Sequence, residues 1–289
     1  MQPGVYKRSL AWLLCVVVSF LNIIPASSDD RISSVLFVKD SLTVPKQSAS
    51  IEGRLVSEGM GRDNGLGGEP IELIVGNKVA ATGMTGGDGR VFLSYTPTVQ
   101  GIVPITLRVG DSPRVAKSQG HGNLVVWERR NPIIVVDIAA LMADPPSGGP
   151  LGGLVRAKLS ERKPLPDAAD ELEKLTRFYY KALYILSAMS GADSFRLSDE
   201  AREWLKANNF PPGYVVILSH GDDMLGAKLD EWSEAGWTTI KTGIVRSKEF
   251  AESFIRRRLD AVIVPEPTKG EAPRRAKVAK EWKEVRKKL

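Results

Sequence analysis

One carboxylate, Asp137, ends an apolar run at residues 133–136. Pro132 has no backbone N–H and is tolerated only where a strand begins, and the run after it does not alternate between apolar and polar residues. These features predict a parallel strand that is buried on both faces. Because open α/β sheets bind ligands at the carboxyl ends of their strands, we expect the Asp137 side chain to reach a site.

A second group of chemically active residues follows a predicted strand at 214–218 and comprises His220, Asp222 and Asp223. These residues could form a metal or acid/base cluster. The alternative, which we favour, is that the two aspartates cap the following helix by accepting N–H groups of its first turn. His121 lies between two glycines with no second His or acid beside it, so a solvated loop residue is expected.

The elements that must position these residues alternate along 131–289. Strands are predicted at 180–186, 214–218 and 261–264, and helices at 167–176, 194–208, 224–235 and 247–258. Asp167, which follows Pro166, is predicted to cap the first of these helices. This order predicts right-handed βαβ crossovers and a parallel sheet, hence an α/β domain over 131–289.

The run ending in Asp137-Ile138-Ala139-Ala140-Leu141 resembles the opening motif of the haloacid dehalogenase-like (HAD) phosphohydrolases, an apolar strand followed by Asp-x-Asp-x-Thr/Val. The stretches 164–168 and 201–213, the latter with Arg202-Glu203-Trp204-Leu205, resemble the lipin and phosphatidate-phosphatase branch of that superfamily. The resemblance covers about 130 residues. It implies a three-layer HAD-like fold built on a Rossmann-type parallel sheet.

The same resemblance implies roles for individual residues. Asp137 would be the nucleophile that the substrate phosphorylates, Ser187 and Lys248 would bind the phosphate, with Lys241 as a competitor of Lys248. Mg²⁺ would be held by Asp137 and Glu266, with the carbonyl oxygen of Ala139 as a further candidate.

The family pattern is incomplete at Ala139, which stands where the second acid belongs, and at Leu141, which stands where the hydroxyl belongs. Residues i and i+2 of an extended segment point the same way, so two acids at that spacing can share one phosphate. One acid attacks and the other moves the proton, and Ala139 cannot carry a proton. The substitution predicts a catalytically inactive pseudophosphatase with a weak or absent Mg²⁺ site.

Short strand-like runs separated by turn signals fill residues 29–130 and lie at 34–38, 48–56, 71–75, 91–95, 102–109 and 124–127. No helix is predicted there. Gly76-Asn77 and Asp88-Gly89 supply the residues that tight hairpins favour. These features predict an all-β antiparallel sandwich, and the stretch 68–97 resembles the bacterial immunoglobulin-like modules of exported proteins.

Residues 1–28 combine Lys7 and Arg8, an apolar stretch and a small-x-small site, which predicts a secretory signal peptide cleaved after Ser28. Cys15, the only cysteine, lies inside this segment, so no disulfide is expected in the mature chain. A secreted or periplasmic location follows from these features; an uncleaved membrane anchor is the alternative.

The net charge of +6 is unevenly distributed. Nine Lys or Arg and three Glu at 269–289 give +6 and the signal segment gives +2, so the remainder sums to −2. No basic surface for nucleic acid is therefore expected on the body of the protein. Val278, Trp282, Val285 and Leu289 predict a basic helix over 271–289, which either docks on the sheet, as we favour, or binds an anionic envelope surface or a partner.

We therefore expect an exported protein in which an immunoglobulin-like module precedes an inactive HAD-like domain that acts in binding or envelope scaffolding. The alternatives are a weak Mg²⁺-dependent phosphatase for phosphatidate or another phosphomonoester, using Asp137, and an adhesion protein. A phosphorylated small molecule or lipid is a possible ligand. The loop 138–163 has the Gly and Pro content of a lid, a binding loop or a disordered segment.

Overall fold

The computed structural model describes residues 31–59, 64–143, 159–188, 191–219, 221, 223–268, 270 and 272–289. Residues Arg31–Leu289 form one compact unit. The predicted signal peptide, most of the Gly- and Pro-rich loop (144–158), His220 and Asp222 lie outside the described residues. No helix among the described residues is both long enough and apolar enough to cross a membrane.

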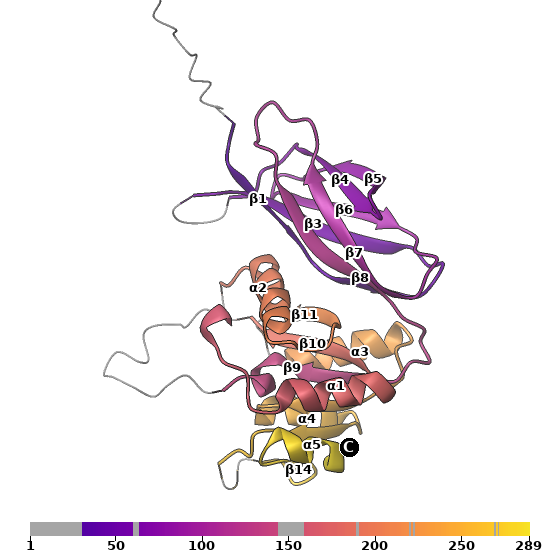
Figure 1. Ribbon diagram of the computed structural model, residues 1–289, viewed down its shortest axis with the longest axis vertical. Helices are drawn as coiled ribbons and strands as arrows, with labels where there is room; N and C mark the ends of the chain where they lie inside the picture. Colours follow the sequence, from indigo (N-terminus) through magenta and orange to yellow (C-terminus); the bar gives the residue numbers. More distant parts are fainter. Residues whose placement is uncertain are drawn as a thin grey trace, which may run out of the picture. The chain divides into compact units, whose positions relative to one another are not determined.

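The first eight strands form two sheets (Figure 1). The smaller sheet has the order β1-β3-β6, with β1 at Ser34–Val38, β3 at Ala49–Ser57 and β6 at Arg90–Tyr95. The larger sheet has the order β2-β8-β7-β4-β5, with β2 at Ser41–Thr43, β8 at Gln119–Val126, β7 at Gly101–Val109, β4 at Pro70–Val75 and β5 at Lys78–Met84. All their pairs are antiparallel except β2 with β8.

One apolar core lies between these two sheets and joins alternate residues of both. Ile51 and Leu55 come from the smaller sheet, and Leu73, Leu107 and Leu124 come from the larger one. Ile51, Leu73 and Leu107 alternate with exposed or half-buried neighbours, which is the two-residue period that a half-buried strand requires. The predicted sandwich is therefore present, and His121, expected in a loop, lies instead on strand β8.

Two predicted hairpin turns differ in outcome. Gly76 and Asn77, with φ values of 55° and 64°, join the paired strands β4 and β5 as a two-residue hairpin. Gly89, with φ 79°, instead joins β5 to β6, which belong to different sheets, so the hairpin prediction at Asp88-Gly89 is wrong. A Cβ on Gly89 would lie 2.2 Å from the Leu55 carbonyl oxygen, and that close approach explains the glycine.

The remaining six strands form one parallel sheet with the order β11-β10-β9-β12-β13-β14. Their bounds are β9 at Ile133–Asp137, β10 at Lys181–Ser187, β11 at Tyr214–Leu218, β12 at Ile240–Val245, β13 at Asp260–Ile263 and β14 at Lys277–Val278. The order reverses direction between β9 and β12. Sequence patterns missed β12, although it is the direct neighbour of β9.

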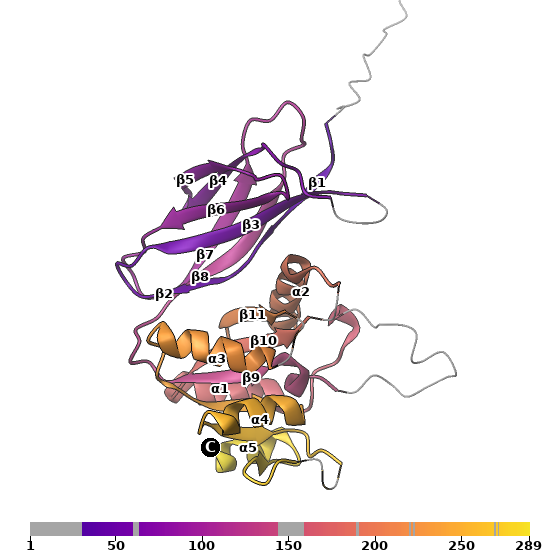
Figure 2. The same ribbon diagram turned by 180° about the vertical axis from the view of Figure 1, so that it is seen from behind.

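Helices cover both faces of this sheet (Figures 1 and 2). Ile134 and Val136 of β9 pack with α1 (Ala168–Phe178), α2 (Ser194–Ala207) and α5 (Trp282–Lys288). Ile133 and Val135 pack with α3 (Met224–Glu234) and α4 (Lys248–Arg256). The predicted burial of β9 on both faces is thus confirmed, because successive residues of a strand point to opposite faces.

Two predicted helix caps are wrong. Asp167 and Asp223 precede α1 and α3 but have φ values of 60° and 44° and make no capping hydrogen bond with their side chains. The Asp167 carboxylate lies 3.1 Å from the Lys283 ammonium nitrogen. The Asp223 carboxylate accepts hydrogen bonds from Ser253, Arg256 and Arg257 of α4 and the residue after it. Each carboxylate is therefore used for a contact between helices.

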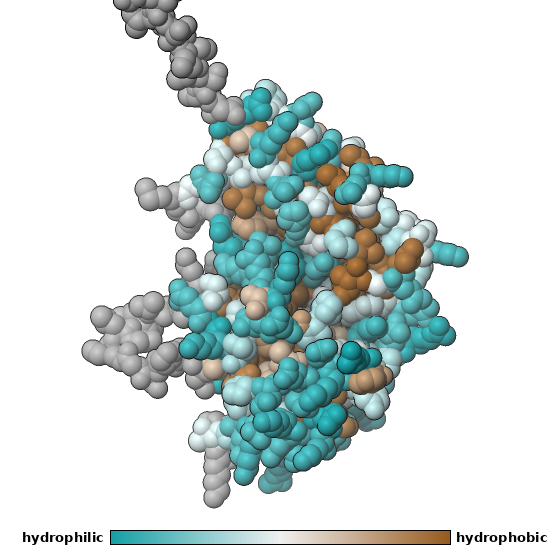
Figure 3. Space-filling view, in the orientation of Figure 1, coloured by the Kyte–Doolittle hydropathy of each residue, from teal (hydrophilic) through white to brown (hydrophobic). Residues whose placement is uncertain are grey.

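The basic carboxyl-terminal segment is not one helix from residue 271, as predicted, because Lys277 and Val278 pair with β13 as strand β14. Only Trp282–Lys288 is helical. Trp282 and Val285 are buried in the core beneath α1, and the indole N–H of Trp282 donates to the Ala140 carbonyl oxygen at 2.9 Å. The helix docks on the sheet, and Figure 3 shows polar residues gathered over α5 while apolar residues gather over the sandwich strands.

Candidate functional site

Asp137 is the last residue of β9 and lies where the strand order of the parallel sheet reverses. Its Cα partner on β10 is Ile185, and the residue before it, Val136, pairs with Ile244 of β12. In open α/β sheets ligands bind at this reversal, outside the carboxyl ends of the strands. The position predicted for Asp137 is therefore the position it has.

The Asp137 side chain is enclosed, with 3% of its surface exposed. The backbone N–H of Ala139 donates to Oδ1 at 3.0 Å and that of Arg246 donates to Oδ2 at 3.2 Å. Burial raises the pKa of this carboxyl from 3.8 to about 6, while those two N–H groups and the charge of Arg246 oppose the rise. The carboxylate also acts as the N-cap of the 3₁₀ turn Ile138–Leu141.

Arg246, the first residue after β12, closes this edge of the sheet. Its guanidinium Nη1 donates to the carbonyl oxygens of Ala139 at 3.1 Å and Met142 at 2.6 Å. Sequence reasoning missed Arg246 because it missed the strand that carries it. The available signal was the apolar pair Ile244-Val245, followed at once by a basic residue.

The oxygen atoms at this edge do not fit a Mg²⁺ ion. Both Asp137 oxygens accept backbone N–H groups, and the Ala139 carbonyl oxygen already faces a guanidinium. Mg²⁺ requires oxygen ligands at about 2.1 Å in near-octahedral geometry, and a second cation beside Arg246 would be repelled. Glu266 is exposed, and no group of three metal-ligating side chains occurs within the described ranges.

Ser187 and Lys248 also lie towards the carboxyl edge, but neither makes a hydrogen bond or ion pair with Asp137. Ser187 is exposed at the end of β10, and its hydroxyl lies 3.5 Å from the Met224 sulfur. The Lys248 ammonium, at the start of α4, is 3.8 Å from Glu252. Lys241, the competing cation, is exposed on β12. Their phosphate-binding roles stay predictions.

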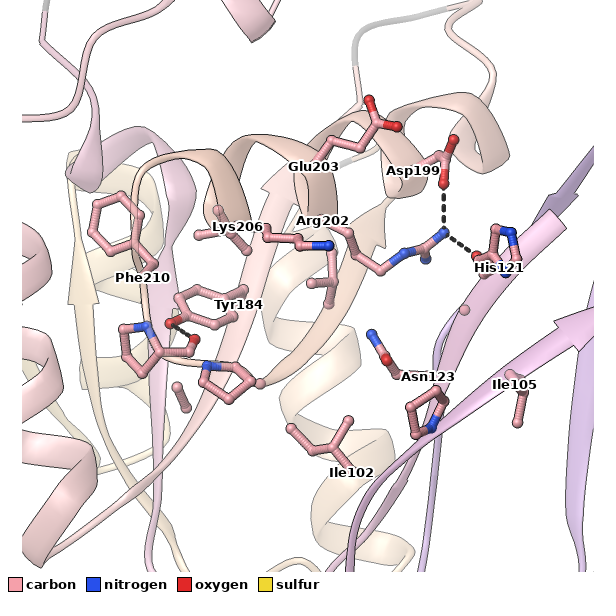
Figure 4. A pocket seen from close by; sticks show the side chains of 18 of the residues that line it. Ile102, Ile105, His121, Asn123, Tyr184, Asp199, Arg202, Glu203, Lys206 and Phe210 are labelled. Atoms are coloured by element: carbon pink, nitrogen blue, oxygen red, sulfur yellow. Dashed lines mark hydrogen bonds and ion pairs between the residues drawn. The ribbon is translucent and has the colours of Figure 1, made fainter. Parts of the chain in front are cut away.

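The opposite, amino edge of the same sheet borders a cleft of about 1300 Å³. One wall is formed by β7 and β8 of the sandwich, and the other by the ends of α1 and α2, the starts of β10 and β11 and the loop at 209–213. Figure 4 shows the Asn123 and Ile102 side chains reaching towards it from the sandwich and Lys206 from α2. A volume of this size exceeds that of a typical small-molecule pocket, about 300–1000 Å³.

A buried ion pair joins the two walls of this cleft. Arg202 of α2 donates to the Asp40 carboxylate at 3.1 Å, and Asp40, in the β1–β2 loop, has a fully buried side chain. The Asp40 carboxylate also accepts the backbone N–H groups of Asn123 at 2.9 Å and Val215 at 3.2 Å. Burial raises the pKa of Asp40 above its ordinary value, while Arg202 and these N–H groups oppose the rise.

Arg202 has further partners around the cleft. Its guanidinium donates to the His121 carbonyl oxygen at 2.8 Å and to the Asp199 carboxylate at 2.9 Å, both drawn in Figure 4. Arg202, which belongs to the stretch that resembles the lipin branch, is thus a cation that connects the sandwich with helix α2. Its charge is balanced by Asp40 and Asp199.

Comparison with known proteins gives coarse likenesses only. No family model matches the chain, and no curated protein matches it. The D,D-heptose 1,7-bisphosphate phosphatase from Burkholderia thailandensis aligns at 12% identity and a TM-score of 0.37, covering 53% of this chain and 94% of that one. The weak structural neighbours of the chain thus include a HAD phosphatase.

Two adhesins are also among the weak neighbours. The D0-D1 domain of intimin aligns at 11% identity with a TM-score of 0.23, covering 32% of this chain and 49% of that one. The Yersinia pseudotuberculosis adhesin InvE aligns at 16% identity with a TM-score of 0.24, covering 35% and 34%. The chain therefore spans about half of the intimin fragment and about a third of InvE. Such likenesses carry no argument about function.

Proposed function

We propose that this chain is an exported, non-catalytic protein in which a HAD-like parallel sheet and an immunoglobulin-like sandwich together serve binding. The observation that supports this most directly is the position of Arg246. Its guanidinium faces the carbonyl oxygen of Ala139, and its backbone N–H is bound by Asp137. At the carboxyl edge of the sheet, the oxygen atoms of Asp137 and Ala139 therefore already bind groups of Arg246.

Three chemical requirements of phosphoryl transfer are unmet at Asp137. A nucleophile must reach the phosphorus atom, but this carboxylate is almost fully enclosed. A proton must be moved at the leaving group, but Ala139 replaces the acid that the family resemblance would place there. A cation whose donors face the phosphate must neutralise it, but the Arg246 guanidinium at this edge donates to two carbonyl oxygens.

The test is hydrolysis of p-nitrophenyl phosphate with Mg²⁺ by the wild-type protein and by the Asp137→Asn variant. We expect no Mg²⁺-dependent hydrolysis above the buffer rate in either protein. Hydrolysis by the wild type that disappears in Asp137→Asn would establish the rival function, a weak Mg²⁺-dependent phosphatase. Equal hydrolysis by both proteins would identify a contaminant and would leave Asp137 without a catalytic role.

Export is the second part of the proposal and is supported by the sequence of residues 1–28 alone. The mass of the chain recovered after expression with its own leader tests this part. We expect a chain that begins at Asp29. A full-length chain retained in the cytoplasm would contradict it.

A further inference from the structure

We propose that the cleft at the amino edge of the parallel sheet binds a carboxylate-bearing oligosaccharide. This inference deepens the proposed function, since it names the ligand class of a protein that binds rather than reacts. It depends on residues that lie at the opposite edge of the sheet from Asp137.

The sandwich wall of the cleft offers neutral groups that both donate and accept hydrogen bonds. Thr106 of β7 and Gln119, His121 and Asn123 of β8 line it. Alternate residues of these strands point into the sandwich core: at Gly120 a Cβ would lie 2.0 Å from the Leu36 carbonyl oxygen. The polar residues between them are thereby turned outward to the cleft. Vicinal hydroxyl groups of a sugar are bound by such bifunctional side chains.

The facing wall carries a small excess of positive charge, with Arg177, Lys181, Arg202 and Lys206 against Glu173, Asp199 and Glu203. Lys206 of α2 and Lys181 at the start of β10 line the cleft, are exposed, and make no ion pair among the described residues. Figure 4 shows the Lys206 amine lying along the cleft, whereas the Glu203 carboxylate on the same helix points away from it. A ligand with separate carboxylates would pair with these two ammonium groups, each a compact point charge.

Apolar surfaces complete the lining. Ile102 and the exposed Pro104 lie on the sandwich wall, and Phe210 and Pro212 lie on the facing wall. Sugar rings present C–H faces as well as hydroxyl groups, so a wall that alternates apolar and neutral polar side chains suits them. A wide cleft accommodates several such rings in a row.

An acidic peptide fits the same cleft less well because the backbone groups it would need are already used. Strand β7 pairs with β4 and β8, but β2 covers β8 only at Leu124–Val126. Nearer the cleft, the Asn123 N–H donates to Asp40 and the His121 carbonyl oxygen accepts from Arg202. At the edge strand β11, the Val215 N–H is bound by Asp40. Strand addition, the usual means of holding an extended peptide, would have to displace Asp40 and Arg202 from these backbone groups.

Isothermal titration calorimetry of the full mature chain tests the proposal with three probes: tetragalacturonic acid, uncharged maltotetraose and a tetraglutamate peptide. We expect tetragalacturonic acid to bind at least tenfold more tightly than the other two. Lys206→Ala should weaken this binding about tenfold, the effect of losing one favourable charge contact. Asn123→Ala should weaken it less, and Lys78→Ala, which removes an exposed lysine on β5 outside the cleft, should leave it unchanged.

Absence of binding by tetragalacturonic acid, equal binding of all three probes, or equal weakening by Lys206→Ala and Lys78→Ala would each overturn the proposal. Preferred binding of tetraglutamate would assign the cleft to peptides and would overturn it too. Because Lys206 is exposed, its variant should fold, and thermal unfolding of each variant checks this. Repeating the titration with Asp137→Asn separates the two proposals. If the wild type hydrolyses phosphate and Asp137→Asn does not, while both bind tetragalacturonic acid, only the proposed function is refuted. If neither protein hydrolyses phosphate and neither binds tetragalacturonic acid, only this inference is refuted.

Discussion

The two edges of the parallel sheet differ in what fills them. At the carboxyl edge, Asp137 is enclosed by the turn after β9, by Arg246 and by the turn's contact with Trp282. At the amino edge, the sandwich and the helix ends leave a cleft of about 1300 Å³ that is lined in part by Arg202, the partner of buried Asp40. A sheet of this topology normally binds ligands at its carboxyl edge. In this protein the side chains that fill the carboxyl edge and the open cleft at the amino edge, more than the strand order, indicate where a ligand fits.

The two edges also differ in the partners of their buried carboxylates. Burial raises the pKa of both, to about 6 for Asp137, and each carboxylate accepts two backbone N–H groups. Only Asp40 is in addition bonded directly to a guanidinium, that of Arg202. Burial of an ion pair costs less than burial of an isolated charge, and removal of one partner exposes that full cost.

The largest loss of stability is expected when the buried Asp40–Arg202 ion pair at the amino edge is removed. Asp40→Ala leaves the Arg202 guanidinium, 12% exposed, without its buried partner and two backbone N–H groups without an acceptor. We expect a loss of about 3–5 kcal/mol in the free energy of unfolding, measured by urea denaturation. Asp199→Ala removes a more exposed partner of the same guanidinium and should cost about 1 kcal/mol or less. Equal losses in the two variants would show that the buried pair does not join the walls.

The next effect tests burial at the carboxyl edge. The pKa of Asp137 is raised in the folded protein, so the folded state binds the proton more tightly and stability falls as pH rises from about 4 to 6. The stability of the wild type relative to Asp137→Asn should therefore decrease by about 2.5 kcal/mol between pH 4 and pH 7. Urea denaturation across this range measures it. A difference that is constant with pH would mean that Asp137 titrates as an exposed carboxyl does.

The smallest effect is expected from Arg246→Ala, which should change stability at the carboxyl edge and leave binding at the amino edge unchanged. Arg246→Ala removes the side-chain donor to the carbonyl oxygens of Ala139 and Met142 and should cost about 2–3 kcal/mol in the free energy of unfolding. Lys248→Ala, which removes an exposed cation two residues later, should change stability by about 0.5 kcal/mol or less. Oligosaccharide binding should be unchanged in both. Weakened binding in Arg246→Ala would show that the two edges are coupled.

Several elements could be predicted because their own residues decide them. The apolar run that forms β9, the alternating strands of the sandwich and the Gly76-Asn77 hairpin all depend on side-chain periodicity or on φ values that few residues tolerate. Strand β12 was missed because Lys241 and Gly243 interrupt its apolar pattern. Gly243 is explained only by the tertiary structure: a Cβ there would lie 2.3 Å from the Phe254 ring.

The sequence by itself determined the position of Asp137, at the end of a strand buried on both faces, and the loss of the acid two residues later. The tertiary structure decided that Arg246 would close that edge, that Asp167 and Asp223 would join helices instead of capping them, and that Asp40 and Arg202 would meet across 162 residues of chain. The physical reason is range. Periodicity and backbone preferences act between near neighbours in the sequence, whereas a buried charge takes whichever partner the packed fold brings within hydrogen-bonding distance.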